Sequence, residues 1–83
     1  MSSLRSEIDN LVSIALNEFR QIPQVNNIIP NCIYEDKMVK FNIFITMQEY
    51  DDNLMSNLAK TEVRVTKMAG IKGYLFNYEY IPV

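Results

Sequence analysis

Residues 38–47, MVKFNIFITM, alternate in the way that side chains alternate between the two faces of a β-strand. One face would carry Val39, Phe41, Ile43 and Ile45, which are β-branched or aromatic residues with a high preference for strands. The other face would carry Lys40, Asn42, Phe44 and Thr46. The stretch therefore predicts a central strand whose apolar face must be covered by a second layer.

Apolar side chains recur three and four residues apart near the start of the chain, which predicts an amphipathic helix. The members of this stripe are Leu4, Ile8, Leu11, Val12, Ala15 and Phe19. The hydroxyl of Ser2 or Ser3 is expected to cap the first turn. Pro23 cannot continue a helix and disfavours helical geometry in the residue before it, so the helix is expected to end near Gln21.

Between this helix and the central strand, residues 22–31 contain two prolines and three asparagines together with several isoleucines. They predict an irregular connection that is held against the core by its apolar side chains. A short strand is then expected at Cys32–Tyr34, followed by a polar turn at Glu35–Lys37. Because two apolar runs separated by a few polar residues indicate a β-hairpin, this strand is expected to pair with the central one.

Residues 53–69 predict a second helix, for which Asp51 or Asp52 would be the N-cap. Gly70 lies where a helix often ends on a left-handed residue. The apolar face of this helix would consist of Leu54, Met55, Leu58, Val65, Met68 and Ala69. We favour the helix because it gives one continuous capped element.

The alternative is that residues 61–68, which also alternate with a period of two, form a fourth strand in a C-terminal hairpin. Two observations favour it: the threonines and valines here are mediocre helix formers, and a helix places Glu62 inside the apolar arc. In the helix, Glu62 is expected at the edge of the stripe, paired with a lysine or with solvent.

Residues 74–81, YLFNYEYI, predict the last strand. Its aromatic side chains alternate onto one face, and Pro82 would end the strand because proline cannot donate to the ladder. Burying the large rings gives the greater stabilisation, so the aromatic face is expected to face the core. The aromatic residues are Tyr74, Phe76, Tyr78 and Tyr80.

These elements predict an α+β fold, a small two-layer sandwich in the order helix-strand-strand-helix-strand, with residues 1–83 forming a single domain. Two helices would cover one face of a three-stranded sheet. If the second and third strands are neighbours, they would run parallel through a right-handed crossover.

The opposite sheet face would be half polar and uncovered, yet would carry bare apolar side chains at Phe44, Leu75 and Ile81. Such a face favours association with a second copy or with another protein. We therefore expect a homodimer, formed through the face or an edge of the sheet, and allow for an unknown protein partner. The predicted interaction surface consists of Lys40, Asn42, Phe44, Thr46, Leu75, Asn77 and Glu79.

The sequence contains few groups that could carry chemistry. It has no histidine, which removes the commonest general base and a frequent metal ligand. Cys32 has no second cysteine to pair with and is expected to be a small buried apolar residue. Neither a GxGxxG nor a GKS/GKT phosphate-binding stretch occurs.

The only acidic cluster is Glu49, Asp51 and Asp52, and helix capping accounts for two of its members. We therefore predict a non-enzymatic interaction or assembly module with no catalytic residue, metal or cofactor. A regulatory domain that binds a small molecule or an ion is the alternative. It would use these carboxylates, which suit Mg²⁺ or Ca²⁺, or the space between the sheet and the helices.

The net charge of −2 is spread along the chain, so neither a nucleic acid nor a membrane is expected as a partner. No apolar run is long enough to span a bilayer, and the N-terminal residues do not have the pattern of a signal peptide. For the aromatic face of residues 74–81, stacking against nucleic-acid bases is a less favoured interpretation than burial in the core. We expect a soluble cytoplasmic protein.

The order of the expected elements, with IPQV after the first helix and MAGIKG before the last strand, loosely resembles two families. One is the cytosolic C-terminal domain of cation diffusion facilitator transporters. The other is the BON domain, which also has a valine or isoleucine after a glycine before its last strand, as at Gly70 and Ile71. The metal-binding histidines of the first family are absent here, and residues 35–37 replace the glycine of the BON hairpin turn. The resemblance assigns no functional residue.

Overall fold

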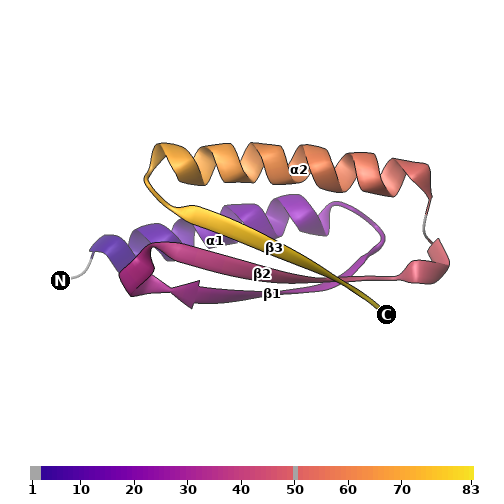
Figure 1. The fold of residues 1–83 in the computed structure, drawn as a ribbon, viewed down its shortest axis with the longest axis horizontal. Helices are drawn as coiled ribbons and strands as arrows, with labels where there is room; N and C mark the ends of the chain where they lie inside the picture. The colour runs from indigo at the N-terminus through magenta and orange to yellow at the C-terminus, as the bar shows by residue number, and fades with distance from the viewer. Residues whose placement is uncertain (1–2, 50) are drawn as a thin grey trace.

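Two helices and a three-stranded sheet form the protein in a computed structural model that describes residues 3–49 and 51–83 (Figure 1). The elements are α1 (Ser3–Arg20), β1 (Val25–Ile33), β2 (Met38–Ile45), α2 (Asp52–Ile71) and β3 (Leu75–Pro82), with short 3-10 turns at Tyr34–Asp36 and Met47–Glu49. This is the predicted order of helix, strand, strand, helix and strand.

The sheet has the order β1-β2-β3, with β2 in the centre. β1 and β2 pair antiparallel, whereas β2 and β3 pair parallel through the crossover helix α2. Ile43 lies opposite Ile28 on one side, and Phe41 lies opposite Tyr78 on the other. The predicted hairpin and the predicted parallel pairing are both confirmed.

The alternating face of β2 is the centre of the core. Val39, Phe41 and Ile43 are completely buried, and Ile45 is 4% exposed. The ring of Phe41 lies 4.9 Å from that of Phe76 and 5.7 Å from that of Tyr78, centre to centre. The aromatic face of β3 therefore faces the helices, as predicted.

α1 covers this core with the predicted stripe. The buried members are Ile8, Leu11, Val12, Ala15 and Phe19. The ring of Phe19 lies 5.6 Å from that of Tyr78, so the end of α1 reaches the β3 side of the sheet. The expected cap at Ser2 and the side chain of Leu4 lie outside the described residues, and Ser3 is already part of the helix.

The prediction for residues 22–31 is wrong, because most of that segment belongs to β1, a strand of nine residues. Ile28 is buried and faces Ile43 across the ladder. Pro30 is tolerated because β1 is an edge strand, where a missing donor can face away from the ladder. Tyr34, expected in the strand, lies in the 3-10 turn and donates a 2.9 Å hydrogen bond from its hydroxyl to Asp9.

α2 is continuous from Asp52 to Ile71, so the alternative of a fourth strand at residues 61–68 is wrong. Asp51 is the N-cap, and its carboxylate accepts a 2.8 Å hydrogen bond from the backbone N–H of Leu54. Met55 is 54% exposed rather than buried, and Thr61 takes a core position at 3% exposure. The buried face of α2 consists of Leu54, Leu58, Thr61, Val65 and Ala69.

The left-handed residue after α2 is Gly73 and not Gly70. Gly73 has φ +85°, whereas the helix runs past Gly70 to Ile71. The backbone N–H of Lys72 closes the last turn on the carbonyls of Ala69 and Gly70. A Cβ added at Gly70 would meet no atom within 4 Å.

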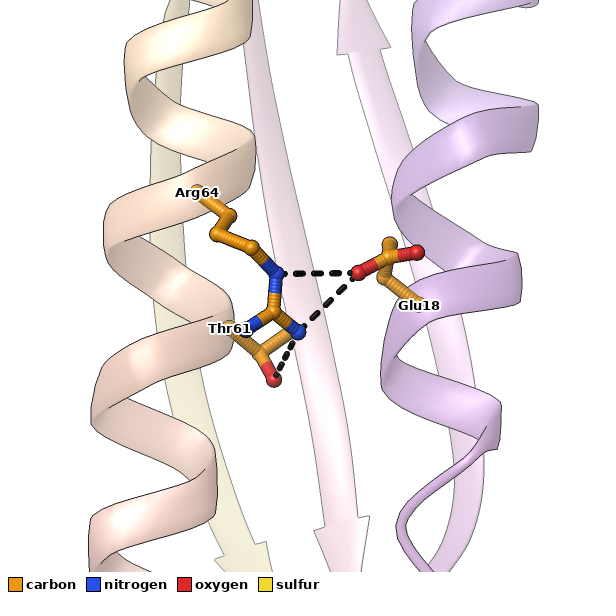
Figure 2. Close-up of polar contacts among 3 residues, drawn as sticks. All are labelled: Glu18, Thr61 and Arg64. Carbon is orange, nitrogen blue, oxygen red and sulfur yellow. Dashed lines mark hydrogen bonds and ion pairs between the residues drawn. The ribbon is translucent and has the colours of Figure 1, made fainter.

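Arg64 joins the two helices on the side of α2 that faces α1 (Figure 2). Its Nε donates a 3.1 Å hydrogen bond to Glu18, and its Nη2 lies 3.0 Å from the same carboxylate oxygen. Nη2 also donates to the hydroxyl oxygen of Thr61 at 3.3 Å, which gives the buried threonine a partner. The opposite flank of α2 therefore lies on the β3 side.

Substitution of the two glycines by alanine tests these backbone assignments. Gly73→Ala is expected to lower the free energy of unfolding by about 1 kcal/mol or more, because a side chain is strained at positive φ. Gly70→Ala is expected to raise it by about 0.5–1 kcal/mol, because alanine favours the helix. Urea unfolding of dilute protein measures both changes, and equal destabilisation by the two substitutions would contradict the assignment.

Candidate interaction surface

Six of the seven predicted surface residues lie on the sheet face that points away from the helices. The register places Lys40 opposite Asn77 and Asn42 opposite Glu79, with Leu75 and Phe44 nearer the two ends of the face. Thr46 lies one residue beyond the end of β2, and its hydroxyl is 3.5 Å from the side-chain nitrogen of Asn26. All seven residues are at least partly exposed.

The apolar side chains of this outer face gather at its two ends. At one end, Phe44 lies opposite Ile81 on β3. At the other end, Met38 lies between Ile33 on β1 and Leu75 on β3. Leu75 is 53% exposed, and the other four side chains are partly buried by their neighbours. Each end therefore presents apolar surface that no helix covers.

β1 adds residues to the outer face that were not predicted from the sequence. Ile29 is 47% exposed and lies opposite Asn42, while Asn31 lies opposite Lys40. The signal was present in the alternation of residues 27–33, in which asparagine and isoleucine occupy the odd positions. This alternation did not predict a strand because it contains Pro30, and proline is unusual inside a strand.

The middle of the outer face is polar but nearly neutral. Lys40 and Glu79 form an ion pair with 2.8 Å between the ammonium nitrogen and the carboxylate oxygen. Their side chains are 47% and 54% exposed, so the pair adds little stability. The amide nitrogen of Asn77 lies 3.3 Å from the sulfur of Met38. A partner that covers this face would therefore meet a lysine and a glutamate whose charges already neutralise each other.

On the covered side of the sheet, β3 and α2 meet through tyrosine hydroxyls. The hydroxyls of Tyr78 and Thr66 lie 2.7 Å apart, and the hydroxyl of Tyr80 donates to the carboxylate of Glu62. Glu62 therefore pairs with a tyrosine and not with a lysine, and its side chain stays partly exposed at the edge of the buried face. Burial raises the pKa of Tyr78 to about 12, and burial, followed by the bond to Glu62, raises the pKa of Tyr80.

The raised pKa of Tyr78 predicts a loss of stability at alkaline pH. Between about pH 10 and 12 the unfolded chain releases this phenol proton while the folded chain keeps it, so stability falls as the pH rises through this window. Tyr78→Phe is expected to lower stability near neutral pH by about 0.5–1.5 kcal/mol. It should also make the alkaline loss shallower. Urea unfolding at several pH values from neutral to alkaline measures both effects, and an unchanged slope in the variant would contradict the prediction.

The other residues that the sequence offered as candidates for a functional site either have structural roles or do not gather into a site. Cys32 is half-buried, and burial raises the pKa of its thiol, so it resembles a small apolar residue more than a nucleophile. Asp51 caps α2, and its second carboxylate oxygen lies 3.5 Å from the side-chain nitrogen of Gln24. Among residues 3–49 and 51–83, no three His, Cys, Asp or Glu side chains gather to hold a metal ion.

One apolar cleft of about 230 Å³ opens between the first half of α2 and the ends of β2 and β3. Met47 and Met55, both about half exposed, stand at its rim. Its lining consists of Ile45, Met47, Leu54, Met55, Leu58, Tyr80 and Pro82.

Comparison of the chain with known proteins finds no matching family model, no matching curated protein and no matching solved structure. Within the part of the chain that the structure describes, neither helix is long and apolar enough to cross a membrane.

Proposed function

We propose that this protein is a non-enzymatic interaction module that associates with a second copy of itself through its sheet. The observation that carries the proposal is the outer face, which no helix of the described chain covers. It exposes Ile29 and Leu75 and leaves Phe44 partly exposed on the central strand. Exposed apolar surface with polar residues between is typical of protein contact sites.

A second copy is a suitable occupant because the outer face complements itself. Its two ends are apolar and its middle carries one cation and one anion, Lys40 and Glu79. In the two-fold arrangement that we propose, the axis crosses the strands at the middle of the face. Each apolar end of one copy then packs against the other apolar end of the second copy. The charged groups lie in the middle of the contact, where the net charge is close to zero. Self-complementarity of one patch is the requirement of a two-fold contact.

Phe44→Glu tests this contact. The substitution places an unpaired carboxylate in the proposed contact, so the dissociation constant across the face should rise by about 30-fold or more. Sedimentation equilibrium over a range of concentrations measures the association, and circular dichroism checks that the fold is retained. A wild-type protein that stays monomeric at the highest concentration would overturn the proposal.

Ile14→Glu is the matched control. Ile14 is 43% exposed on α1, away from the sheet, and the substitution adds the same charge in place of another apolar side chain. Its association should match that of the wild type. Equal weakening by both substitutions would show that net charge, and not the outer face, controls association.

A small-molecule regulatory domain is the second candidate, and the apolar cleft beside Met55 supports it. At about 230 Å³ the cleft is smaller than most ligand pockets, which measure roughly 300–1,000 Å³, so this function ranks below self-association.

A thermal-shift screen against small apolar metabolites and divalent cations tests the second candidate. A specific ligand should raise the melting temperature in proportion to the logarithm of its concentration. For a ligand of the cleft, Met55→Glu should remove the shift while leaving the melting temperature of the free protein nearly unchanged. A flat screen would count against this function.

A further inference from the structure

The outer edge of β3 has unpaired backbone groups along its length. The backbone N–H of Leu75 bonds the carbonyl of Lys37, and that of Val83 bonds the carbonyl of Ile45, each at 2.9 Å. Since backbone groups alternate in direction along a strand, the residues between, Phe76, Tyr78 and Tyr80, point their N–H and C=O groups away from β2. Within the described residues these groups have no hydrogen-bond partner.

The outer edge of β1 differs from that of β3, because most of its outward-pointing backbone N–H groups are absent or already bonded. The register with β2 directs the backbone groups of Ile28, Pro30 and Cys32 to this edge. The N–H of Ile28 is already bonded to the side-chain oxygen of Asn27 at 2.9 Å, and proline has no N–H. A bulge between Val25 and Asn27 further disrupts the edge. Bulges and prolines are the devices that keep sheet edges from pairing; in β3 the register is regular, and its one proline, Pro82, is the last residue of the strand.

The flank of α2 above this edge carries several short residues, with Glu62 and Lys67 beside them. Ala59, Val63, Thr66 and Gly70 recur at helical spacing, and the contact of Thr66 with Tyr78 places their flank on the β3 side. Arg64, which contacts Glu18 of α1 (Figure 2), borders this surface, since Ala59 and Val63 line one shallow depression with Lys60 and Arg64. Val63 is 65% exposed. Nothing in the single chain requires glycine at position 70, since its backbone φ is not positive and its surroundings are open.

We propose that β3 pairs antiparallel with β3 of a second copy around a two-fold axis at Tyr78. The two sheets then form one six-stranded sheet, and the short-chain flanks of the two α2 helices face each other above the axis. This contact is separate from the outer face and adds a second surface of association to the proposed function.

The pairing brings compatible side chains together. In the two-fold register, Tyr78 faces Tyr78 and Phe76 faces Tyr80 of the second copy on the covered side. On the outer face, Leu75 faces Ile81, and Asn77 faces Glu79 of the second copy. No like charges stand directly opposite each other, which is the condition that cross-strand pairs must meet.

The size of the sheet also favours the pairing. Three strands of eight or nine residues present a flat face of roughly 26 by 14 Å, or about 370 Å². Stable interfaces bury about 600–1,000 Å² on each partner. A six-stranded sheet doubles the flat face, so two such sheets can pack on each other with an area in the stable range. The edge contact and the face contact then reinforce each other in a tetramer.

Cysteine cross-linking tests the register directly, in a Cys32→Ala, Phe44→Glu background that leaves no other thiol and removes the face contact. A mixture of the Asn77→Cys and Glu79→Cys proteins should form a disulfide-linked dimer, because directly opposite residues in an antiparallel pair lie about 4.5–5.5 Å apart. Each protein alone should cross-link much less, since the same positions lie diagonally across the axis. A mixture of Asn31→Cys, on β1, with Glu79→Cys is the control and should not cross-link.

Sedimentation of variants separates the edge contact from the face contact. Phe44→Glu, which removes the face contact, should remain dimeric through the edge at high concentration, and adding Val63→Glu should raise that dissociation constant by at least 10-fold. Adding Ile14→Glu instead should leave it unchanged. A Phe44→Glu protein that is monomeric would overturn the edge contact while leaving the face contact standing. A dimer that does not form the disulfide between positions 77 and 79 would also overturn the edge contact.

Discussion

Burial of one face of β2 is the constraint on which the rest of the structure depends. Phe41 lies at its centre, completely buried between rings from β3 and opposite Pro30 of β1. A central strand with one fully apolar face can be stable only when a second layer excludes water from it. The apolar stripes of α1 and α2 supply this layer, and the sheet therefore has one covered face and one open face.

The open face and the open edge follow from how few elements the chain has. Two helices can cover one face of a three-stranded sheet but cannot also cover the other (Figure 1). β1 forms one edge of the sheet with a proline in mid-strand and a bulge, whereas β3 forms the other edge with a regular row of backbone groups up to its last residue, Pro82. In both proposals, surfaces that the single chain leaves incomplete are completed by association.

The elements that periodicity governs were predictable from the sequence, and those that depend on partners in space were not. The alternation in β2 and β3 and the stripe in α1 each reflect a single buried face, so their faces were predicted correctly. β1 was missed because the effect of Pro30 depends on whether its nitrogen faces a neighbouring strand, which only the sheet order decides. Thr61 was not predicted to be buried because its partner, Arg64, is fixed by Glu18 on another helix.

The candidate surface was predictable in part for the same reason. Positions on β2 and β3 followed from alternation, but Ile29 required β1 to be a strand. The pairing of Glu62 with Tyr80 required knowing that tyrosine rings from β3 extend along the flank of α2. A half-buried tyrosine gives its ring to the core and its hydroxyl to a polar partner at the rim.

The parallel pairing of β2 with β3 also bears on how the chain folds. The β1–β2 hairpin closes a short loop and can form early, whereas β3 must be brought back across the whole of α2 before it can pair. Until it arrives, the central strand has a free edge and the apolar ring of Phe41 lacks its aromatic neighbours. Completion of the core therefore depends on a long-range contact that the hairpin does not need, and contacts of this kind are the ones that slow folding.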